Sequence, residues 1–315
     1  MDVRYDDRDV DPGREFGPTV VAVGTFDGVH MGHQALLAEA RNLAAGLDAR
    51  SAVALFDRPP TGAGSPEVAP LLLTDLQHRI ELLSGLGIDL CYVIRFDEAR
   101  SRQAPEAFVR EVVVDRLAAR ALVVGEDFHF GWRPRGDTAL LTELGSVHDL
   151  KVVGLPLVGL PGAAGPVSAS GVREALVRGD VAGAALMLGR PHEVRGVVEH
   201  GDHRGRTIGF PTANVAVPAD IALPADGIYA GWYERPSGEV HPAAISLGKR
   251  PTFYDDHGVR LLEAYLLDFD GDLYTEHAKL RFQTWLRGEV KFGSIDALVE
   301  ALRHDVEDTR GALSR

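Results

Sequence analysis

Two histidines near the start of the chain follow a glycine turn, within the segment Gly24-Thr25-Phe26-Asp27-Gly28-Val29-His30-Met31-Gly32-His33. The apolar run Thr19–Val23 precedes it and the amphipathic run Gln34–Leu43 follows it, which predicts a strand, a turn and a helix. The free N–H groups at such a helix start attract phosphate, and an imidazole there can polarise a phosphoryl oxygen. We therefore expect a nucleotide phosphate site with His30 and His33 as catalytic groups. Its nucleotide-binding residues are expected to be Gly24, Phe26, Asp27 and Gly32.

Two further segments carry groups that suit a nucleotide and a planar ring. An aromatic-rich loop containing Asp127 and Phe128 runs off the end of a predicted strand, where its rings could stack on a ligand ring. Hydroxyl groups and an arginine stand at the start of a later helical pattern and suggest a triphosphate grip. These phosphate-binding candidates are Ser168, Ser170 and Arg173.

A glycine-rich loop, His200–Asn214, is the third candidate. Gly205 and its neighbouring glycines keep the loop free of side chains near phosphates, and Pro211 stiffens its exit. Thr212 and Asn214 then offer neutral oxygen ligands, an arrangement that suits Mg²⁺ bound mainly through nucleotide phosphates. No set of histidines or cysteines with metal-ligand spacing accompanies His30 and His33, so no zinc is expected.

Each of these segments also has a purely structural alternative. The histidine turn could be a strand-to-helix connection with two surface histidines. The aromatic loop could be core packing at a tight turn, and a serine at a helix start is a common N-cap. The glycine-rich loop could be a hairpin loop made of turn residues.

The surrounding elements predict two domains. In the first part of the chain, short apolar runs alternate with helical patterns, which predicts an α/β, Rossmann-like domain with a parallel sheet and ligands beyond the carboxyl ends of the strands. The predicted strands are Val20–Val23, Ala52–Phe56, Leu90–Ile94, Ala121–Val124 and Val152–Leu155, and the predicted helices are Gln34–Ala45, Asp75–Leu86, Pro105–Ala118 and Thr138–Val147.

After Gly189-Arg190-Pro191, short β segments separated by turn residues predict a closed antiparallel barrel, followed by a terminal helix at Ile295–Val306. We place the two domains at residues 17–187 and 188–310.

The amino-acid composition limits the classes of partner and the compartments that are expected for this chain. With a net charge of −13 and no basic run, the chain is not expected to bind nucleic acid. Its single cysteine, Cys91, excludes an internal disulfide and fits a reducing compartment. The charged N-terminal segment is not expected to be a secretory signal, and no apolar run is long enough to cross a membrane. We expect a cytoplasmic protein whose partners are small molecules, with self-association as a further possibility.

Taken together, these motifs resemble the prokaryotic bifunctional riboflavin kinase/FAD synthetase family over residues 17–306. The resemblance also rests on Gly189-Arg190-Pro191, Gly227–Ala230, Leu247–Phe253, Leu266–Phe269, Asp272–Tyr274, Leu286–Glu289 and Lys291-Phe292. It implies that the first domain adenylylates FMN with ATP to give FAD and pyrophosphate. It also implies that the barrel phosphorylates riboflavin to FMN with ATP and Mg²⁺.

The resemblance also implies roles for individual residues. Thr212 and Asn214 match the ligands of Mg²⁺ and phosphate in the kinase, and Glu263 matches the general base that accepts the proton of the ribityl 5′-hydroxyl. Arg287 matches a flavin- or nucleotide-contacting residue, with a solvated helix-end arginine as its alternative. Asp127 and Phe128 are implied to contact the flavin.

The chain departs from the family pattern in several places. Ala169 stands where the serine-rich motif has a hydroxyl, and Pro59 stands where the family has a histidine. The loop Thr61–Ser65 also differs from the family, and Thr275 replaces the usual glycine after Tyr274. Two alternatives to the bifunctional enzyme therefore stay open. One is a riboflavin kinase whose first domain is adenylylation-deficient or uses another nucleotide or flavin analogue, and the other is a flavin-binding regulator without turnover. Nucleotide preference and flavin channelling do not follow from the sequence.

Overall fold

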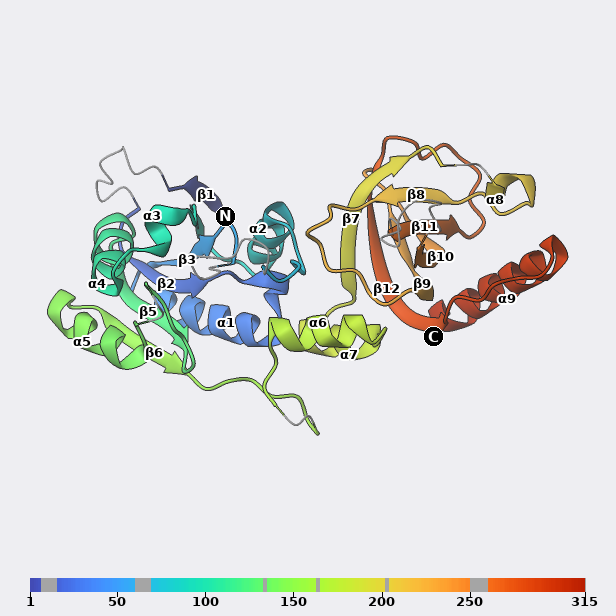
Figure 1. The fold of residues 1–315 in the computed structure, drawn as a ribbon. Coiled ribbons are helices and arrows are strands. Elements are labelled where there is room, and N and C mark those ends of the chain that lie inside the picture. The colour runs from blue at the N-terminus through green and yellow to red at the C-terminus, as the bar shows by residue number, and fades with distance from the viewer. Residues whose placement is uncertain are drawn as a thin grey trace. The chain divides into compact units, whose positions relative to one another are not determined.

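A computed structural model describes residues 1–6, 16–59, 69–132, 135–162, 165–201, 204–249 and 260–314. The chain forms two compact units, Met1–Ser168 and Ala169–Arg315 (Figure 1). Of the family motif Leu247–Phe253, residues 250–253 lie outside the described part, as does the loop 60–68 that follows Pro59.

The first unit is a parallel α/β unit, as predicted. Its sheet has the strand order β1-β4-β3-β2-β5-β6, and every neighbouring pair is parallel. The strands are β1 (Asp2–Tyr5), β2 (Thr19–Gly24), β3 (Arg50–Phe56), β4 (Leu90–Ile94), β5 (Ala119–Gly125) and β6 (Lys151–Leu155). The helical segments are η1 (Asp27–Val29), α1 (Met31–Gly46), α2 (Leu76–Gly85), α3 (Glu98–Ser101), α4 (Pro105–Phe108), the π-helical η3 (Val109–Arg116) and α5 (Thr138–His148).

Both faces of this sheet are covered. Along β2, Val21 and Val23 belong to one apolar core, whereas Val20 and Ala22 belong to another on the opposite face. A strand buried on both faces needs apolar residues at every position, which is why β2 is a continuous apolar run in the sequence. The edge strand β1 carries alternating charged residues and was not predicted.

The second unit contains a closed barrel with the strand order β10-β11-β8-β7-β12-β9, and every pair in it is antiparallel. The strands are β7 (His192–Glu199), β8 (Ala213–Ala216), β9 (Gly227–Glu234), β10 (Val240–Lys249), β11 (Arg260–Leu266) and β12 (His277–Arg287). The helices are α6 (Ala169–Val177), α7 (Val181–Leu188), α8 (Arg204–Thr207) and the terminal α9 (Ile295–Leu313), which ends later than predicted.

The two short helices α6 and α7 belong to the second unit. Helix α7 packs against β7 and β12, and the Leu176 carbonyl accepts a hydrogen bond from the Ala225 N–H at 2.9 Å. Gly179, between these helices, leaves room for the Trp285 ring, which a Cβ at that position would strike. The compact units therefore divide before α6, and the functional boundary at 187/188 stays a prediction. No helix among the described residues is long and apolar enough to cross a membrane.

Candidate active sites

The histidine turn is a strained, tightly packed connection between β2 and α1. Phe26 has a left-handed backbone (φ 50°) and is 1% exposed. A Cβ on Gly24 would lie 3.2 Å from the Phe26 ring, so glycine permits this close approach. The His30 and His33 rings stack with their centroids 3.6 Å apart. The His30 Nδ1 accepts a hydrogen bond from the His33 N–H at 3.4 Å, so its side chain caps α1.

His33 is held in its neutral form. Burial of the ring, and secondarily the neighbouring His30, lowers the pKa of His33 well below 6.5. Its Nδ1 is buried and has no hydrogen-bond partner among the described residues. A neutral imidazole retains one N–H donor and one acceptor nitrogen. His33 can therefore hydrogen-bond to a ligand at neutral pH without first losing a proton.

The Asp27 carboxylate forms hydrogen bonds within the protein that stabilise the turn. It is 4% exposed and accepts hydrogen bonds from the N–H groups of Leu73 at 2.9 Å and Thr74 at 3.1 Å. The Thr74 hydroxyl in turn accepts from the Gly28 N–H at 2.9 Å. The Asp27 side chain thus ties the turn to the segment before α2, and a direct contact with nucleotide stays a prediction.

Arg79 on α2 was missed by the sequence analysis. Its side chain is fully buried and donates to three carbonyls at the carboxyl ends of β2 and β3: Thr25 at 2.8 Å, Phe56 at 3.0 Å and Asp57 at 2.6 Å. The sequence pattern could have identified it, because Arg79 falls between Leu76 and Leu83 on the buried stripe of its helix. An arginine in that position must find buried acceptors.

The turn opens into a cavity of about 820 Å³, here called the first-unit cavity, a size typical of ligand pockets. The cavity brings together most residues predicted for the first domain: Gly24, Phe26, His30, Gly32, His33, Asp127, Phe128 and Ser168. Aromatic rings form much of the remaining wall, including Phe56, Phe96, Phe108, Phe130 and Trp132. The Phe128 and Phe130 rings are stacked at 5.5 Å. Asp27 is not among the lining residues, and Ser170 and Arg173 lie on α6 in the second unit.

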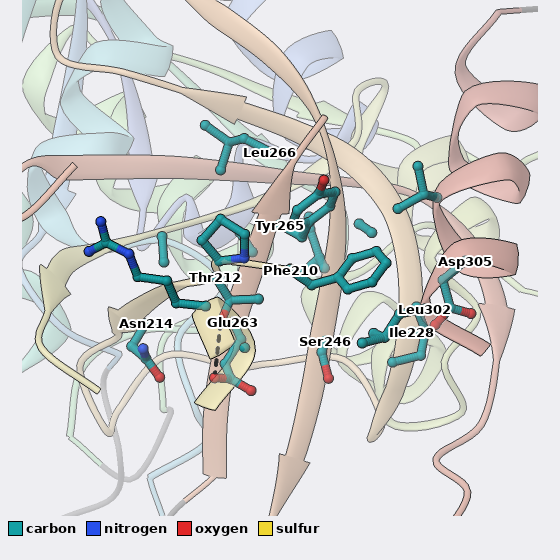
Figure 2. A pocket seen from close by; sticks show the side chains of 18 of the residues that line it. Phe210, Thr212, Asn214, Ile228, Ser246, Glu263, Tyr265, Leu266, Leu302 and Asp305 are labelled. Carbon is teal, nitrogen blue, oxygen red and sulfur yellow. Dashed lines mark hydrogen bonds between the residues drawn. The ribbon is translucent and has the colours of Figure 1, made fainter. Parts of the chain in front are cut away.

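A second cavity, of about 800 Å³, lies on the barrel and is here called the barrel cavity. Three adjacent strands present polar side chains to it in register: Asn214 of β8 pairs with Glu263 of β11, which pairs with Ser246 of β10. The Thr212 hydroxyl donates to Glu263 Oε1 at 3.3 Å. Figure 2 shows this polar group at one side of the cavity, with Leu302 and Asp305 of α9 at the other.

The predicted magnesium ligands lie beside glycines that cannot be replaced without a clash. A Cβ at Gly201 would collide with the Asn214 amide, and a Cβ at Gly205 would collide with the Phe210 carbonyl. The hydroxyl of Thr212, the amide oxygen of Asn214 and the nearby Glu263 carboxylate are hard oxygen donors, and they fit Mg²⁺. In the described part of the chain, no group of three His, Cys, Asp or Glu side chains is placed to hold a metal. Mg²⁺ bound partly through substrate phosphates does not need such a group.

Arg287 forms a two-pronged ion pair with α9. Its Nε and one terminal nitrogen donate to the two carboxylate oxygens of Asp305, both at 2.7 Å, and Asp305 is 3% exposed. The guanidinium also lies 5.8 Å from the centre of the Phe292 ring. Arg287 is the last residue of β12, and its ion pair holds α9 against the barrel. It is therefore not a solvated helix-end arginine. Both partners line the barrel cavity, and contact with flavin stays a prediction.

Several cavity residues gave no sequence signal. In the barrel cavity these include Ser246 and Asp305, and in the first-unit cavity Phe96, Arg100, Gln103 and Trp132. They come from separate elements and have no shared spacing along the chain. The Glu289 carboxylate lies over Gly248, and partial burial, followed by the nearby Asp226, raises its pKa.

Comparison with known proteins finds a matching family model for each part of the chain. A family model described as FAD synthetase matches residues 14–165, and one described as riboflavin kinase matches residues 188–313. Proteins named bifunctional riboflavin kinase/FMN adenylyltransferase are similar over most of their length. That of Listeria monocytogenes is 35% identical over 94% of this chain and 93% of its own, and that of Pseudomonas fluorescens is 37% identical over 92% of each.

A solved structure shares the whole fold. It is described as a macrolide-efflux protein from Streptococcus pneumoniae, is 29% identical, and covers 98% of each chain with a TM-score of 0.85. The parallel α/β unit with a histidine turn and the barrel with its polar strand register together define a two-site transferase. The chain belongs to the bifunctional riboflavin kinase/FMN adenylyltransferase family.

Proposed function

We propose that this chain converts riboflavin to FMN in the barrel cavity and FMN to FAD in the first-unit cavity, using ATP in both reactions. The observation that carries the proposal is the agreement between the two family matches and the two cavities. Each match falls on the unit whose cavity holds the corresponding predicted residues. Neither Pro59 nor Ala169 is among the residues that line the first-unit cavity.

In the kinase reaction, Glu263 acts as the general base. Its carboxylate accepts the proton of the ribityl 5′-hydroxyl as that oxygen bonds to the γ-phosphorus of ATP and the bond to the β-phosphate oxygen breaks. The hydrogen bond from Thr212 orients the carboxylate. Thr212 and Asn214 would hold Mg²⁺, which neutralises phosphate charge when bound. Arg287 would contact the flavin from the α9 side, where Asp305 fixes its guanidinium.

In the adenylylation reaction, a phosphate oxygen of FMN bonds to the α-phosphorus of ATP and pyrophosphate leaves. Neutral His33 donates a hydrogen bond to a phosphate oxygen and stabilises the charge that develops there. His30 keeps the start of α1 capped and the His33 ring stacked. Gly24 and Gly32 leave room for the nucleotide, and the Ser168 hydroxyl on the cavity wall would contact its triphosphate. Asp127 and Phe128 would contact the flavin ring.

Two expectations about the whole protein also stay proposals. The single reduced cysteine is the reason for expecting a cytoplasmic location. Self-association of the chain is tested by sedimentation at several protein concentrations, where a concentration-dependent mass would support it.

One assay with two matched variants tests the function. Purified protein is incubated with riboflavin, ATP and Mg²⁺, and the flavins are separated by chromatography; the wild type should form FMN and then FAD. Glu263→Gln should slow FMN formation roughly 10²–10⁴-fold, the usual contribution of a positioned general base, and leave FAD formation from added FMN intact. His33→Ala should slow FAD formation roughly 10²-fold or more and leave FMN formation intact.

Each variant serves as the control for the other. His33 is preferred to His30 because the His30 side chain also caps α1. Loss of both activities in either variant would indicate unfolding rather than a catalytic role. FMN formation without any FAD in the wild type would contradict the adenylylation half of the proposal.

A further inference from the structure

The edge strand β1 places Asp6 next to the ligand side of the first unit. Strand β1 pairs in parallel with β4, with Tyr5 opposite Val93, and the Asp6 N–H donates to the Val93 carbonyl at 2.8 Å. Asp6 therefore lies at the carboxyl edge of the sheet, the edge where ligands bind in such folds. The FAD synthetase family match begins at residue 14, so Asp6 lies outside it.

The Asp6 carboxylate is buried among donors from different elements. Its Oδ1 accepts from the Tyr92 hydroxyl of β4 at 2.7 Å, and its Oδ2 accepts from the Arg100 guanidinium of α3 at 2.6 Å. The Arg116 guanidinium lies 3.8 Å away. The side chain of Asp6 is 0% exposed and that of Arg100 is 3% exposed. The pair is therefore shielded from water, and loss of the carboxylate charge would leave a buried cation poorly compensated.

Arg100 extends this network to the wall of the first-unit cavity. It donates to Gln103 Oε1 at 2.6 Å and to Glu111 Oε1 at 3.3 Å, and the Gln103 amide donates to Glu111 Oε2 at 2.6 Å. The backbone carbonyl of Gln103 accepts a hydrogen bond from the backbone N–H of Trp132 at 3.0 Å. Arg100, Gln103 and Trp132 all line the cavity. A continuous set of hydrogen bonds thus joins Asp6 to the aromatic loop.

The histidine turn is held by different groups. Asp27 ties it to the segment before α2, and Arg79 ties the carboxyl end of β2 to that of β3. A change at Asp6 should therefore disturb the wall formed by α3 and the aromatic loop without disturbing the phosphate-facing turn.

We propose that Asp6 is a positioning residue for flavin binding in the first-unit cavity. It holds Arg100, and through it Gln103 and Trp132, in the arrangement that completes the wall facing the flavin ring. This proposal rests on the proposed binding of FMN in that cavity.

The test compares Asp6→Asn with Asp2→Asn in the full chain. Asp2 is a matched control because it begins the strand that Asp6 follows and pairs with Arg50 at 2.6 Å, but its side chain is 52% exposed. In FAD formation, Asp6→Asn should raise the KM for FMN roughly tenfold, the equivalent of one charge-assisted hydrogen bond. The KM for ATP and the rate of riboflavin phosphorylation should change by less than about twofold, because the residues proposed for those functions take no part in the hydrogen bonds that join Asp6 to Arg100, Gln103 and Trp132. Asp2→Asn should change none of these.

A binding measurement separates this proposal from the proposed function. The chain has three tryptophans, and replacing Trp232 and Trp285 by phenylalanine leaves Trp132 on the cavity wall as the reporter. Quenching of Trp132 by FMN measures flavin binding in this cavity even if no FAD is formed. Asp6→Asn should weaken that binding roughly tenfold, and Asp2→Asn should not.

Two results would overturn the proposal. One is equal FMN affinity in Asp6→Asn and Asp2→Asn. The other is an equal rise in the KM values for FMN and ATP together with a lowered Tm, which would show that Asp6 only stabilises the fold.

Discussion

Burial sets the charge of one histidine in each unit. His33 is neutral near pH 7 because burial lowers its pKa, which suits a hydrogen-bond donor to phosphate. In the barrel, His192 is 2% exposed, and burial lowers its pKa to about 4. Its Nε2 donates to the Ala222 carbonyl at 3.0 Å, and its ring lies 6.2 Å from that of Phe282. No chemistry is assigned to His192, so its titration should affect stability alone.

His192 should make the barrel acid-sensitive. The unfolded chain protonates this histidine below about pH 6.5, whereas the folded barrel resists protonation until about pH 4. The unfolded state therefore binds more protons in this window, and stability is lost as the pH falls. Between pH 7 and pH 5 the free energy of unfolding should fall by about 2 kcal/mol on account of His192.

Urea unfolding checks this prediction in a Trp132→Phe background, where the remaining tryptophans, Trp232 and Trp285, both lie in the barrel. His192→Gln should remove that part of the pH dependence. His304→Gln is the matched control, because His304 is exposed on α9. An unchanged pH dependence in His192→Gln would contradict the assigned cause.

At the scale of elements, α9 completes the barrel cavity and is held by two ion pairs that differ in how far they are exposed to solvent. The Arg287–Asp305 pair is partly buried and lines the cavity. The Arg310–Asp268 pair is exposed, with side chains 51% and 67% accessible. Only the first pair is shielded enough for its loss to move the helix.

Loss of the Asp305 charge should loosen α9 and weaken riboflavin binding. Asp305→Asn leaves the Arg287 guanidinium with a neutral partner and should destabilise the barrel by about 1–3 kcal/mol. The KM for riboflavin should rise while FAD formation from added FMN stays unchanged. Arg310→Gln on the same helix is the control and should have little effect on either. Thermal denaturation and kinase kinetics measure both effects, and equal behaviour of the two variants would refute the distinction.

Prediction of elements was most successful where periodicity was strong. The five apolar strands of the sheet and the barrel pattern were recognised because burial on both faces or on alternate residues leaves a visible pattern. Strand β1 was missed because Asp2, Arg4 and Tyr5 are exposed at the sheet edge. Helix Pro105–Ala118 was predicted as one helix, but the structure has a short α-helix followed by the π-helical η3. Its apolar spacing does not distinguish these two forms.

At the scale of the whole molecule, α6 and α7 decide how the chain can be divided. In α7, Val181, Ala184 and Leu188 are buried, and the helix packs on β7 and β12. The boundary expected from the sequence, between residues 187 and 188, leaves α6 and α7 out of a kinase fragment. The structure indicates that such a fragment would lose the helix that covers this side of the barrel.

A fragment of residues 169–315 should therefore be more stable than one of residues 187–315. Burial of apolar side chains on α7, chiefly Val181 and Ala184, contributes about 3 kcal/mol to the free energy of unfolding. Both fragments should form FMN from riboflavin, because every residue lining the barrel cavity lies after Val197. Tm values and FMN formation check this. A shorter fragment that is equally stable would show that α6 and α7 are not part of the kinase domain.

The sequence by itself determined the types of most elements, the two-domain order and the motifs around His30 and Thr212. These features depend on periodicity and turn chemistry, which act over a few neighbouring residues, whereas the role of Glu263 followed from the family resemblance. Only the tertiary structure decided that Glu263 stands between Asn214 and Ser246, and that Arg287 is paired with Asp305. The burial of Asp6 beside Arg100 is of the same kind. Such contacts join residues far apart in the chain, and they exist only after the sheet and barrel have set their registers.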